Sequence, residues 1–200
     1  MFINKVYRRV LIEPRERKLN RELASRWEAK FRSNAGPREA IQSKEAALKW
    51  LLEAKSNATH PGNGFDRAYN LAVQSWERPY PETTGYIISS LIDSSEAFPH
   101  LQLDDHAAQA GHWLKEVQFE SGAICSKQWF VGNNTPSVFN TGMVLHGFVS
   151  LFQRQQDPEI ENAMHRAANW LIAIQEKDGA WIKHAYNGVA HTYYTMVAWA

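Results

Sequence analysis

Apolar residues recur along this chain with the period of an α-helix rather than with the alternation of a half-buried strand. The pattern predicts a succession of helices joined by polar connections, and it leaves residues 67–76 ambiguous. The predicted helices span residues 15–31, 43–55, 87–92, 106–118, 137–153, 157–174 and 193–200. The sequence therefore predicts an all-α fold.

The predicted helices are of two kinds, which alternate along the chain. The first kind is amphipathic and carries a tryptophan that we expect to lie in the core: Trp50, Trp113 or Trp170. The second kind, clearest at 137–153, is apolar on nearly every side. A helix that is apolar all round is covered on all sides, whereas an amphipathic helix shows one face to water. The alternation predicts inner helices surrounded by outer ones.

Parts of the chain repeat at one constant offset, and the matched positions fall in the same order in each copy. The matched pairs are Trp113-Leu114 with Trp170-Leu171, Gln118 with Gln175, Gly122-Ala123 with Gly179-Ala180, and Thr84-Gly85 with Thr141-Gly142. Gly64-Phe65 is interpreted as an earlier, degenerate copy. One hairpin cannot bury its own apolar face, so successive hairpins must stack. We predict an α/α-toroid, or partial barrel, of helical hairpins over 43–200, incomplete at its C-terminal end, preceded by a charged helical arm over 1–42.

Composition narrows the function classes further. The formal net charge of +1 implies no polyelectrolyte partner, and the basic residues of the arm occur without a nucleic-acid motif. No apolar run approaches the roughly 18 residues that a membrane span needs. The first residues contain no apolar stretch suited to a secretory signal. A single cysteine, Cys125, excludes an intramolecular disulfide and fits a reducing compartment, so we expect a cytoplasmic protein.

Residues 175–181 (QEKDGAW) resemble the QW motif of the squalene–hopene cyclase and protein prenyltransferase superfamily, whose fold is an α/α-barrel. The resemblance covers 43–200 and is strongest over 110–200. It implies that Gln175 caps a helix end and stacks on Trp181, a role in stability rather than chemistry. Segments 80–86, 139–142 and 191–194 are also similar to toroid proteins of polysaccharide gene clusters.

The chemistry of the cyclase superfamily finds little support in the residues. A terpene cyclase needs an Asp-x-Asp-Asp acid, which is absent, and Asp104-Asp105 fits helix capping instead. Zinc in a prenyltransferase needs an Asp-x-Cys before its histidine, and Cys125 has no acidic neighbour close in sequence. No pair of histidines has metal-ligand spacing. We expect no metal and no cofactor.

The starts of the inner helices carry the candidate site. In a toroid these starts face one end of the cavity, where the positive helix ends favour an anionic group. The predicted catalytic residues are Glu82, Tyr86, His191 and Tyr193, and the predicted substrate-binding residues are Trp129, Asn140, Thr141, His184 and Tyr194. For Thr84 and Thr141, hydrogen bonds to backbone carbonyls are the favoured interpretation. For Glu82 and His191, the sequence favours a structural role and a functional role equally.

The predicted function is a carbohydrate-active enzyme that acts on a complex, uronate-containing glycan. Hydrolysis needs two carboxyl groups, and only Glu82 lies at these starts, so lyase or epimerase chemistry is favoured over hydrolysis. Tyrosine or histidine would serve as the base and Asn140 would neutralise the uronate carboxylate. Two alternatives remain open: a non-catalytic glycan- or protein-binding module, and a terpene cyclase or prenyltransferase-like enzyme. Partners other than a small polar substrate are not expected, except an oligomer that completes the ring.

Overall fold

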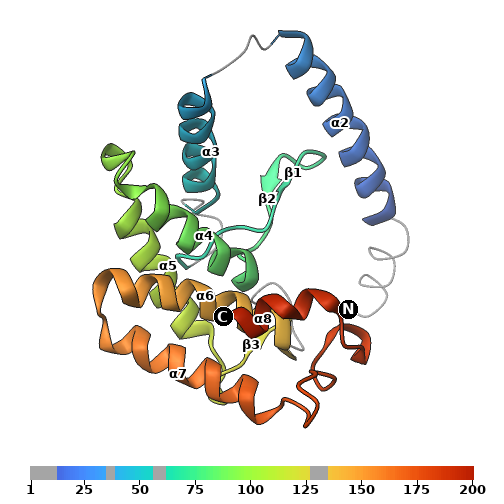
Figure 1. Ribbon diagram of the computed structural model, residues 1–200. Helices are drawn as coiled ribbons and strands as arrows, with labels where there is room; N and C mark the ends of the chain where they lie inside the picture. Colours follow the sequence, from blue (N-terminus) through green and yellow to red (C-terminus); the bar gives the residue numbers. More distant parts are fainter. Residues whose placement is uncertain (1–12, 35–38, 56–61, 127–134) are drawn as a thin grey trace.

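The computed structural model of the protein describes residues 13–34, 39–55, 62–126 and 135–200. This part is mostly helical, which confirms the predicted all-α class. Its α-helices are α2 (Glu13–Asn34), α3 (Ala40–Lys55), α4 (Pro81–Ser95), α5 (Leu103–Val117), α6 (Val138–Gln155), α7 (Pro158–Ala173) and α8 (Thr195–Trp199), shown in Figure 1. None of the helices in these ranges combines the length and the apolar character that a membrane-spanning helix needs.

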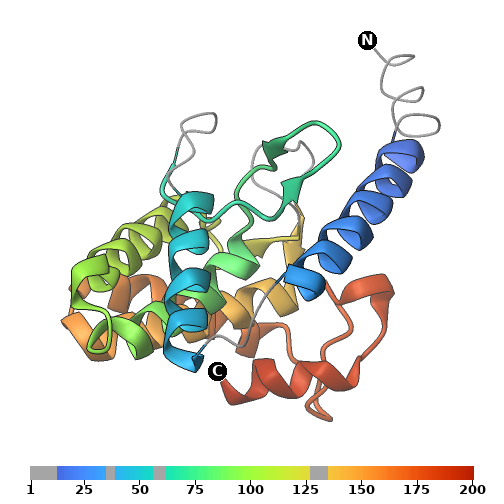
Figure 2. The ribbon, with the colours of Figure 1, turned by 90° about the horizontal axis from the view of Figure 1, so that it is seen from above.

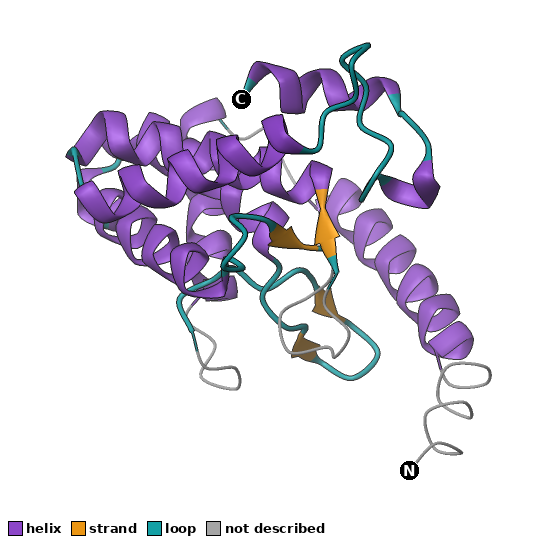
Figure 3. Ribbon diagram, turned by 90° about the horizontal axis from the view of Figure 1, so that it is seen from below, coloured by secondary structure: helices purple, strands orange, loops and turns teal. Residues whose placement is uncertain are grey.

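Short elements connect the helices. Two antiparallel pairs join β1 (Tyr69–Asn70) to β2 (Ser75–Trp76), and β3 (Ile124–Cys125) to β4 (Pro136–Ser137). Single 3-10 turns form η2 (Pro99–Leu101), η3 (Tyr186–Gly188) and η4 (Thr192–Tyr194). The strands gather on one side of the helices (Figure 3). The ambiguous segment 67–76 is therefore a small β-hairpin, and β3–β4 ties the connection after α5 to the start of α6.

Helix α6 lies at the centre of the molecule and packs against α4, α5, α7 and α8. Its faces are buried on nearly all sides, as the sequence predicts for 137–153. Glycines let α4 and α6 approach closely. A Cβ on Gly147 would lie 2.8 Å from the carbonyl oxygen of Gly85, and one on Gly85 would fall on the carbonyl oxygen of Met143. No side chain larger than hydrogen fits at this crossing without a backbone shift.

Helices α3, α5 and α7 follow one another: Lys55 of α3 donates to Gln109 of α5, and α5 packs against α7 (Figure 1). Helices α5 and α7 are amphipathic, and their tryptophans Trp113 and Trp170 are buried as predicted. The prediction for Trp50 is wrong, because half of its side chain surface is exposed. The core side of α3 is formed by Leu48, Leu51 and Leu52 instead. Trp50 lies on the other side and packs against Trp76 of β2, with ring centroids 5.0 Å apart.

The sequence repeat is visible as the same turn after each of the outer helices α5 and α7. The Gln118 amide donates to the Gly122 carbonyl oxygen over 2.9 Å, and the Gln175 amide donates to Gly179 over the same distance. Both glycines have positive φ, +93° and +88°, a conformation that glycine adopts without steric cost. The same side-chain bond on the same glycine conformation shows that the two turns are structural equivalents.

The tryptophan of the QW-like segment has a different role from the one that the resemblance implies. The Trp181 indole N–H donates to the Leu171 carbonyl oxygen over 2.9 Å, so the tryptophan caps the end of α7. Gln175 holds the turn rather than the helix end. Both side chains thus donate to backbone carbonyl groups.

The buried threonines make the repeated contact between each turn and the next inner helix. Thr84 donates to the Tyr80 carbonyl and accepts from the Phe65 N–H, at 2.9 and 3.0 Å. Thr141 donates to the Ser137 carbonyl and accepts from the Ile124 N–H, at 2.7 and 2.9 Å. Both hydroxyls are buried, and each donates one hydrogen bond to a backbone carbonyl and accepts one from a backbone N–H. These bonds fix where α4 and α6 begin.

Helix α2 stands apart from the packed helices (Figure 2). It is anchored through Asn20, whose amide donates to Asn70 over 2.9 Å and whose oxygen accepts from the Ala72 N–H over 2.9 Å. Trp27 is 68% exposed. The helix spans the amphipathic segment predicted for 15–31 and touches the β1–β2 hairpin.

Candidate functional site

Helices α4, α6 and α8 begin at one place, although α8, unlike α4 and α6, is mostly exposed. Their N-cap residues are Tyr80 for α4, Ser137 for α6 and Tyr194 for α8, and successive caps are separated by the same offset that relates Trp113 to Trp170. All three line one cavity of about 440 Å³. That volume lies within the range of roughly 300–1,000 Å³ typical of small-molecule sites. The segments 80–86, 139–142 and 191–194 thus all reach one cavity, which we call the amino-end pocket.

Rings and polar side chains share the walls of the amino-end pocket. The rings belong to Tyr80, Phe139, His184, Tyr186, Tyr193 and Tyr194. The polar side chains are those of Glu82, Ser126, Thr135, Ser137, Asn140 and Asn187. Among these described lining residues Glu82 carries the only carboxyl group, and no lysine or arginine is present. The pocket suits a ligand with flat apolar faces and hydroxyl groups.

Asn140 is held by its neighbours on both sides of its amide. Its nitrogen donates to the Cys125 carbonyl over 2.7 Å and to the Tyr80 hydroxyl over 3.3 Å. Its oxygen accepts from the Ser137 hydroxyl over 3.2 Å. The side chain is buried, so these bonds use most of its capacity. Asn140 therefore fixes the wall of the pocket, and it has little left with which to neutralise a ligand carboxylate.

Glu82 and Tyr80 form a hydrogen-bonded acid and phenol at the start of α4. Burial raises the pKa of Glu82, and the hydrogen bond from Tyr80 only partly offsets this. Burial and the adjacent Glu82 raise the pKa of Tyr80 to about 12. A carboxyl with a raised pKa retains its proton to higher pH than an exposed carboxyl does.

Aromatic rings at the start of α6 and in η4 also line the pocket. The Tyr193 ring lies edge-on to Phe139, with centroids 4.9 Å apart, and stacks on the His191 ring at 5.0 Å with an interplanar angle of 10°. Desolvation and the hydrogen bond with Tyr194 raise the pKa of Tyr193 to about 12. Tyr193 is therefore a hydrogen-bond donor rather than a base at neutral pH.

The loop before η4 is fastened to the pocket by its backbone. The Tyr186 N–H donates to the Tyr194 hydroxyl over 2.7 Å, and the Val138 N–H donates to the His184 carbonyl over 3.2 Å. His184 has a φ of 62°, and its ring packs on Trp170 at 5.6 Å. Burial lowers the pKa of His184, which favours its neutral form. These contacts bring a segment that the sequence shows only as a loop to the mouth of the pocket.

The predicted site residues divide into three groups. Glu82, Asn140, His184, Tyr193 and Tyr194 line the amino-end pocket. Tyr86, Thr141 and His191 lie next to it without lining it. The prediction for Thr141 as a substrate contact is therefore corrected, because its side chain is fully buried and bonded to the backbone. Trp129 lies outside the described residues.

His191 and Tyr86 act through their neighbours. His191 stacks on Tyr193, and its Nε2 lies 3.0 Å from the Tyr186 carbonyl oxygen. Burial, followed by the charge of Glu82, raises the pKa of Tyr86. Both residues thus surround the lining groups and support them.

The lining residue Ser137 lies outside the segments 80–86, 139–142 and 191–194, whereas Tyr80 and Phe139 lie inside them but are not among the predicted site residues. The constant offset of the repeat contained the signal for two of them, because Tyr80, Ser137 and Tyr194 are equivalent positions. Phe139 is likewise equivalent to Glu82. At this position of the repeat, α4 therefore has an acid, Glu82, and α6 has an aromatic ring, Phe139.

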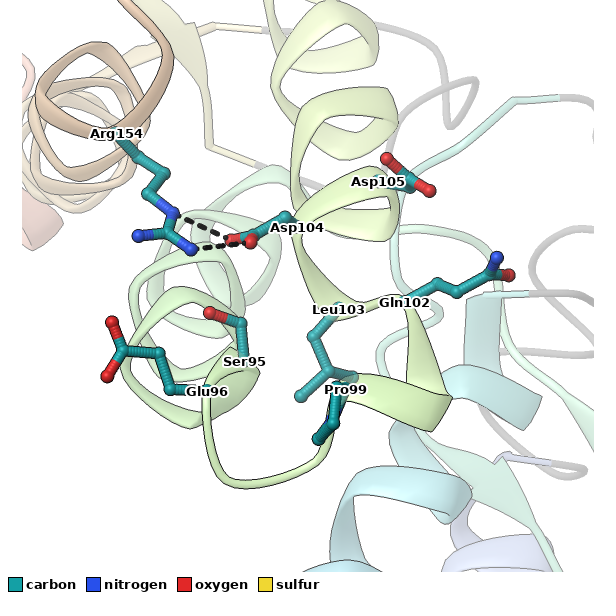
Figure 4. Close-up of a pocket in the computed structure, with 8 residues that line it drawn as sticks. All are labelled: Ser95, Glu96, Pro99, Gln102, Leu103, Asp104, Asp105 and Arg154. Atoms are coloured by element: carbon teal, nitrogen blue, oxygen red, sulfur yellow. Dashed lines mark hydrogen bonds and ion pairs between the residues drawn. The ribbon is translucent and has the colours of Figure 1, made fainter.

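A second cavity lies at the other end of α4 and α6, and we call it the carboxyl-end pocket. It measures about 380 Å³. Figure 4 shows Arg154 of α6 reaching Asp104 of α5, whereas Asp105 and Gln102 point away from that pair. The guanidinium bonds both carboxylate oxygens of Asp104, at 3.3 and 2.9 Å. The pair is partly exposed.

Within the described ranges, no three His, Cys, Asp or Glu side chains gather closely enough to hold one metal ion. Comparison of the chain with known protein families, with curated proteins and with solved structures finds no significant match.

Proposed function

We propose that the protein is a carbohydrate-active α/α-toroid whose amino-end pocket binds a unit of a complex glycan, with Glu82 as the proton-transferring group. The supporting observation is that three helix starts from equivalent places of the repeat meet at one pocket. Its described lining residues include several aromatic rings and one carboxyl group, Glu82, whose pKa is raised. Ring faces suit the apolar faces of a pyranose, and buried hydroxyls and amides suit its polar edge. On this proposal the stacked hairpins are successive units of a toroid.

The arrangement supports proton donation by Glu82 better than proton abstraction by a tyrosine. General acid–base catalysis works best when the pKa of the group lies near the working pH. The pKa values of Tyr80 and Tyr193, both about 12, are too high for that role. Asn140 is committed to Cys125, Tyr80 and Ser137, so it does not supply the neutralising group that uronate chemistry needs. The sequence favours lyase or epimerase chemistry because it offers a tyrosine base and Asn140 to neutralise the uronate carboxylate. Neither argument is supported by these pKa values and hydrogen bonds.

The experiment is a screen of neutral and uronate-containing polysaccharides with two readouts. New reducing ends report hydrolysis, and absorbance of an unsaturated uronate reports elimination. We expect turnover of at least one glycan, and a fall of about a hundredfold or more in Glu82→Gln, the typical contribution of a positioned acid. The matched control is Glu96→Gln in the carboxyl-end pocket, which should retain full activity. Turnover that survives in Glu82→Gln would refute the assigned role.

A second candidate is a glycan-binding module without catalysis. The observation that favours it is the single carboxyl among the described lining residues, because glycoside hydrolysis usually needs two. Calorimetric titration with the same oligosaccharides separates the candidates. Saturable binding that is weakened in Tyr193→Ala, without product in either readout, supports the binding module.

A further inference from the structure

The repeat shows how one outer helix recognises the next. On the side of α5 that faces α7, Lys115 pairs with Glu159 over 2.7 Å, and the Gln118 amide donates to the Ala163 carbonyl over 3.0 Å. The following turn presses on α7 so closely that a Cβ on Gly122 would fall on the Arg166 carbonyl. An ion pair, an amide-to-backbone bond and a glycine contact thus define the interface between successive units.

The equivalent face of α7 lacks a partner within the described residues. The offset of the repeat relates Lys115 to Ile172, Gln118 to Gln175 and Gly122 to Gly179. Ile172 is 69% exposed, and beyond its own chain neighbours no described heavy atom lies within 4 Å of a Cβ built on Gly179. Gln175 keeps its bond within the turn but is exposed. We call this exposed face of α7 the C-terminal edge. It is equivalent to the face of α5 that packs against α7.

The first helix of this series, α3, carries a second edge that the described residues cover only in part, through the packing of Trp76 on Trp50. Ala47 and Trp50 lie one helical turn apart on the side of α3 that the core does not cover, and both are exposed. Their apolar character is the reason why the sequence predicts that side as buried. The next outer helix, α5, is contacted on its corresponding side by α3, through Lys55 on Gln109 over 2.5 Å. The N-terminal edge is thus an apolar helix face at the opposite end of the same stack.

We infer that a second copy of the chain docks head to tail, with the N-terminal edge of α3 packed on the C-terminal edge of α7. The contact continues the α3, α5, α7 series across two molecules. It places Ile172, which stands where α5 has a lysine, against an apolar face instead of against Glu159. Such a heterologous contact uses two different surfaces, so it leaves one edge free on each molecule and either closes into a ring or extends.

The test uses the full chain and measures its mass by sedimentation velocity across a wide concentration range. The expected result is a concentration-dependent oligomer. Ile172→Lys should abolish self-association by charging the C-terminal edge, and Ala47→Glu should abolish it by charging the N-terminal edge. Glu116→Lys, on the exposed face of α5, is the matched control and should associate like the unchanged chain. Circular dichroism and thermal melting establish that each variant is folded.

Mixing the two edge variants gives the decisive result. Each variant retains one intact edge, so the mixture should form a single heterodimer although neither variant associates alone. A chain that stays monomeric at every concentration overturns the inference. So does an Ala47→Glu variant that still self-associates, because the α7 edge would then pair with itself or with another surface. Failure of this assembly leaves the glycan assay of the amino-end pocket unaffected.

Discussion

The two ends of α4 and α6 use charge in opposite ways. At the carboxyl-end pocket, Asp104 and Arg154 neutralise one another in a partly exposed position, and hydrogen bonding with Asp104 raises the pKa of Arg154. At the amino-end pocket, Glu82 has a phenol and an amide network around it, and desolvation raises its pKa. The first end pairs Asp104 with a cation, whereas the second holds a carboxyl in an environment that disfavours its charge.

Helix position alone does not explain this difference. Glu82 lies in the first turn of α4, where the helix dipole favours an ionised carboxylate by about 0.3–1 kcal/mol. Its pKa is nevertheless raised, so desolvation outweighs the dipole. Such strained electrostatics are typical of functional sites, although structural networks also produce them. The carboxyl-end pocket thus has an exposed ion pair, whereas the amino-end pocket has a half-buried carboxyl with a raised pKa.

The largest expected change in the free energy of unfolding comes from a substitution where α4 and α6 cross. Gly85→Val places two methyl groups against the backbone of Met143, and overpacking of this kind costs about 1–3 kcal/mol or more. Ser90→Val, on the exposed side of the same helix, is the control and should change the free energy of unfolding by less than about 0.5 kcal/mol. Chemical denaturation measures both. Equal stability of the two variants would mean that α4 and α6 do not cross as described.

A smaller loss is expected from Thr141→Val. The substitution keeps the shape of the side chain but leaves the buried Ile124 N–H without its acceptor, at a cost of about 1–3 kcal/mol. Because Thr141 fixes the start of α6, glycan binding should weaken in parallel. Thr135→Val, at an exposed residue, is the control for stability. Full stability in Thr141→Val would show that the repeated threonine contact is not formed.

The pH dependence of stability tests whether burial near the start of α4 disfavours an ionised carboxyl. Burial raises the pKa of Asp66, which lies beside the start of α4, from 3.8 to about 7. Between these values the unfolded chain ionises while folded Asp66 stays protonated, so stability is greatest at acidic pH and falls as pH rises toward 7. The loss should be on the order of 1 kcal/mol, since relaxation and water reduce the penalty of a buried charge.

Asp66→Asn should remove this fall in stability, measured as the change in Tm between pH 4 and pH 7. The exposed Asp93→Asn variant should keep it. An unchanged slope in Asp66→Asn would mean that this carboxyl is ionised in the folded protein throughout the range.

The smallest effect is expected at the carboxyl-end pocket. Arg154→Ala removes an ion pair that water surrounds, and such pairs contribute little to stability because solvent screens them. The Tm and the activity on glycans should both remain unchanged. A large loss in either would erase the contrast between the two ends.

The helices and the repeat could be predicted from the sequence because apolar periodicity and glycine positions are local signals. The pattern that correctly places Trp113 and Trp170 in the core fails for Trp50. It shows that a face is apolar, but it does not show whether another helix covers that face. The meeting of Glu82, Asn140 and Tyr193 was also predictable, since all lie near inner-helix starts.

The sequence could not predict which polar side chains face the pocket. That depends on which of them already form hydrogen bonds with the backbone or with neighbouring side chains. Asn140 and Thr141 are neighbours with similar polar side chains, yet one lines the pocket and the other is buried in backbone contacts. The loop that carries His184 adopts positive φ at His184 and Asn187, which no helical or strand period indicates. Equivalence of the three helix caps was readable only after the helix starts were known.

The most direct test of the amino-end pocket is an NMR titration of the side-chain carboxyl of Glu82, assigned with Glu82→Gln in protein labelled at glutamate. We expect a titration midpoint above the ordinary value of 4.5, and a shift of both signal and midpoint when oligosaccharides are added. A midpoint at 4.5 that no saccharide moves would contradict it.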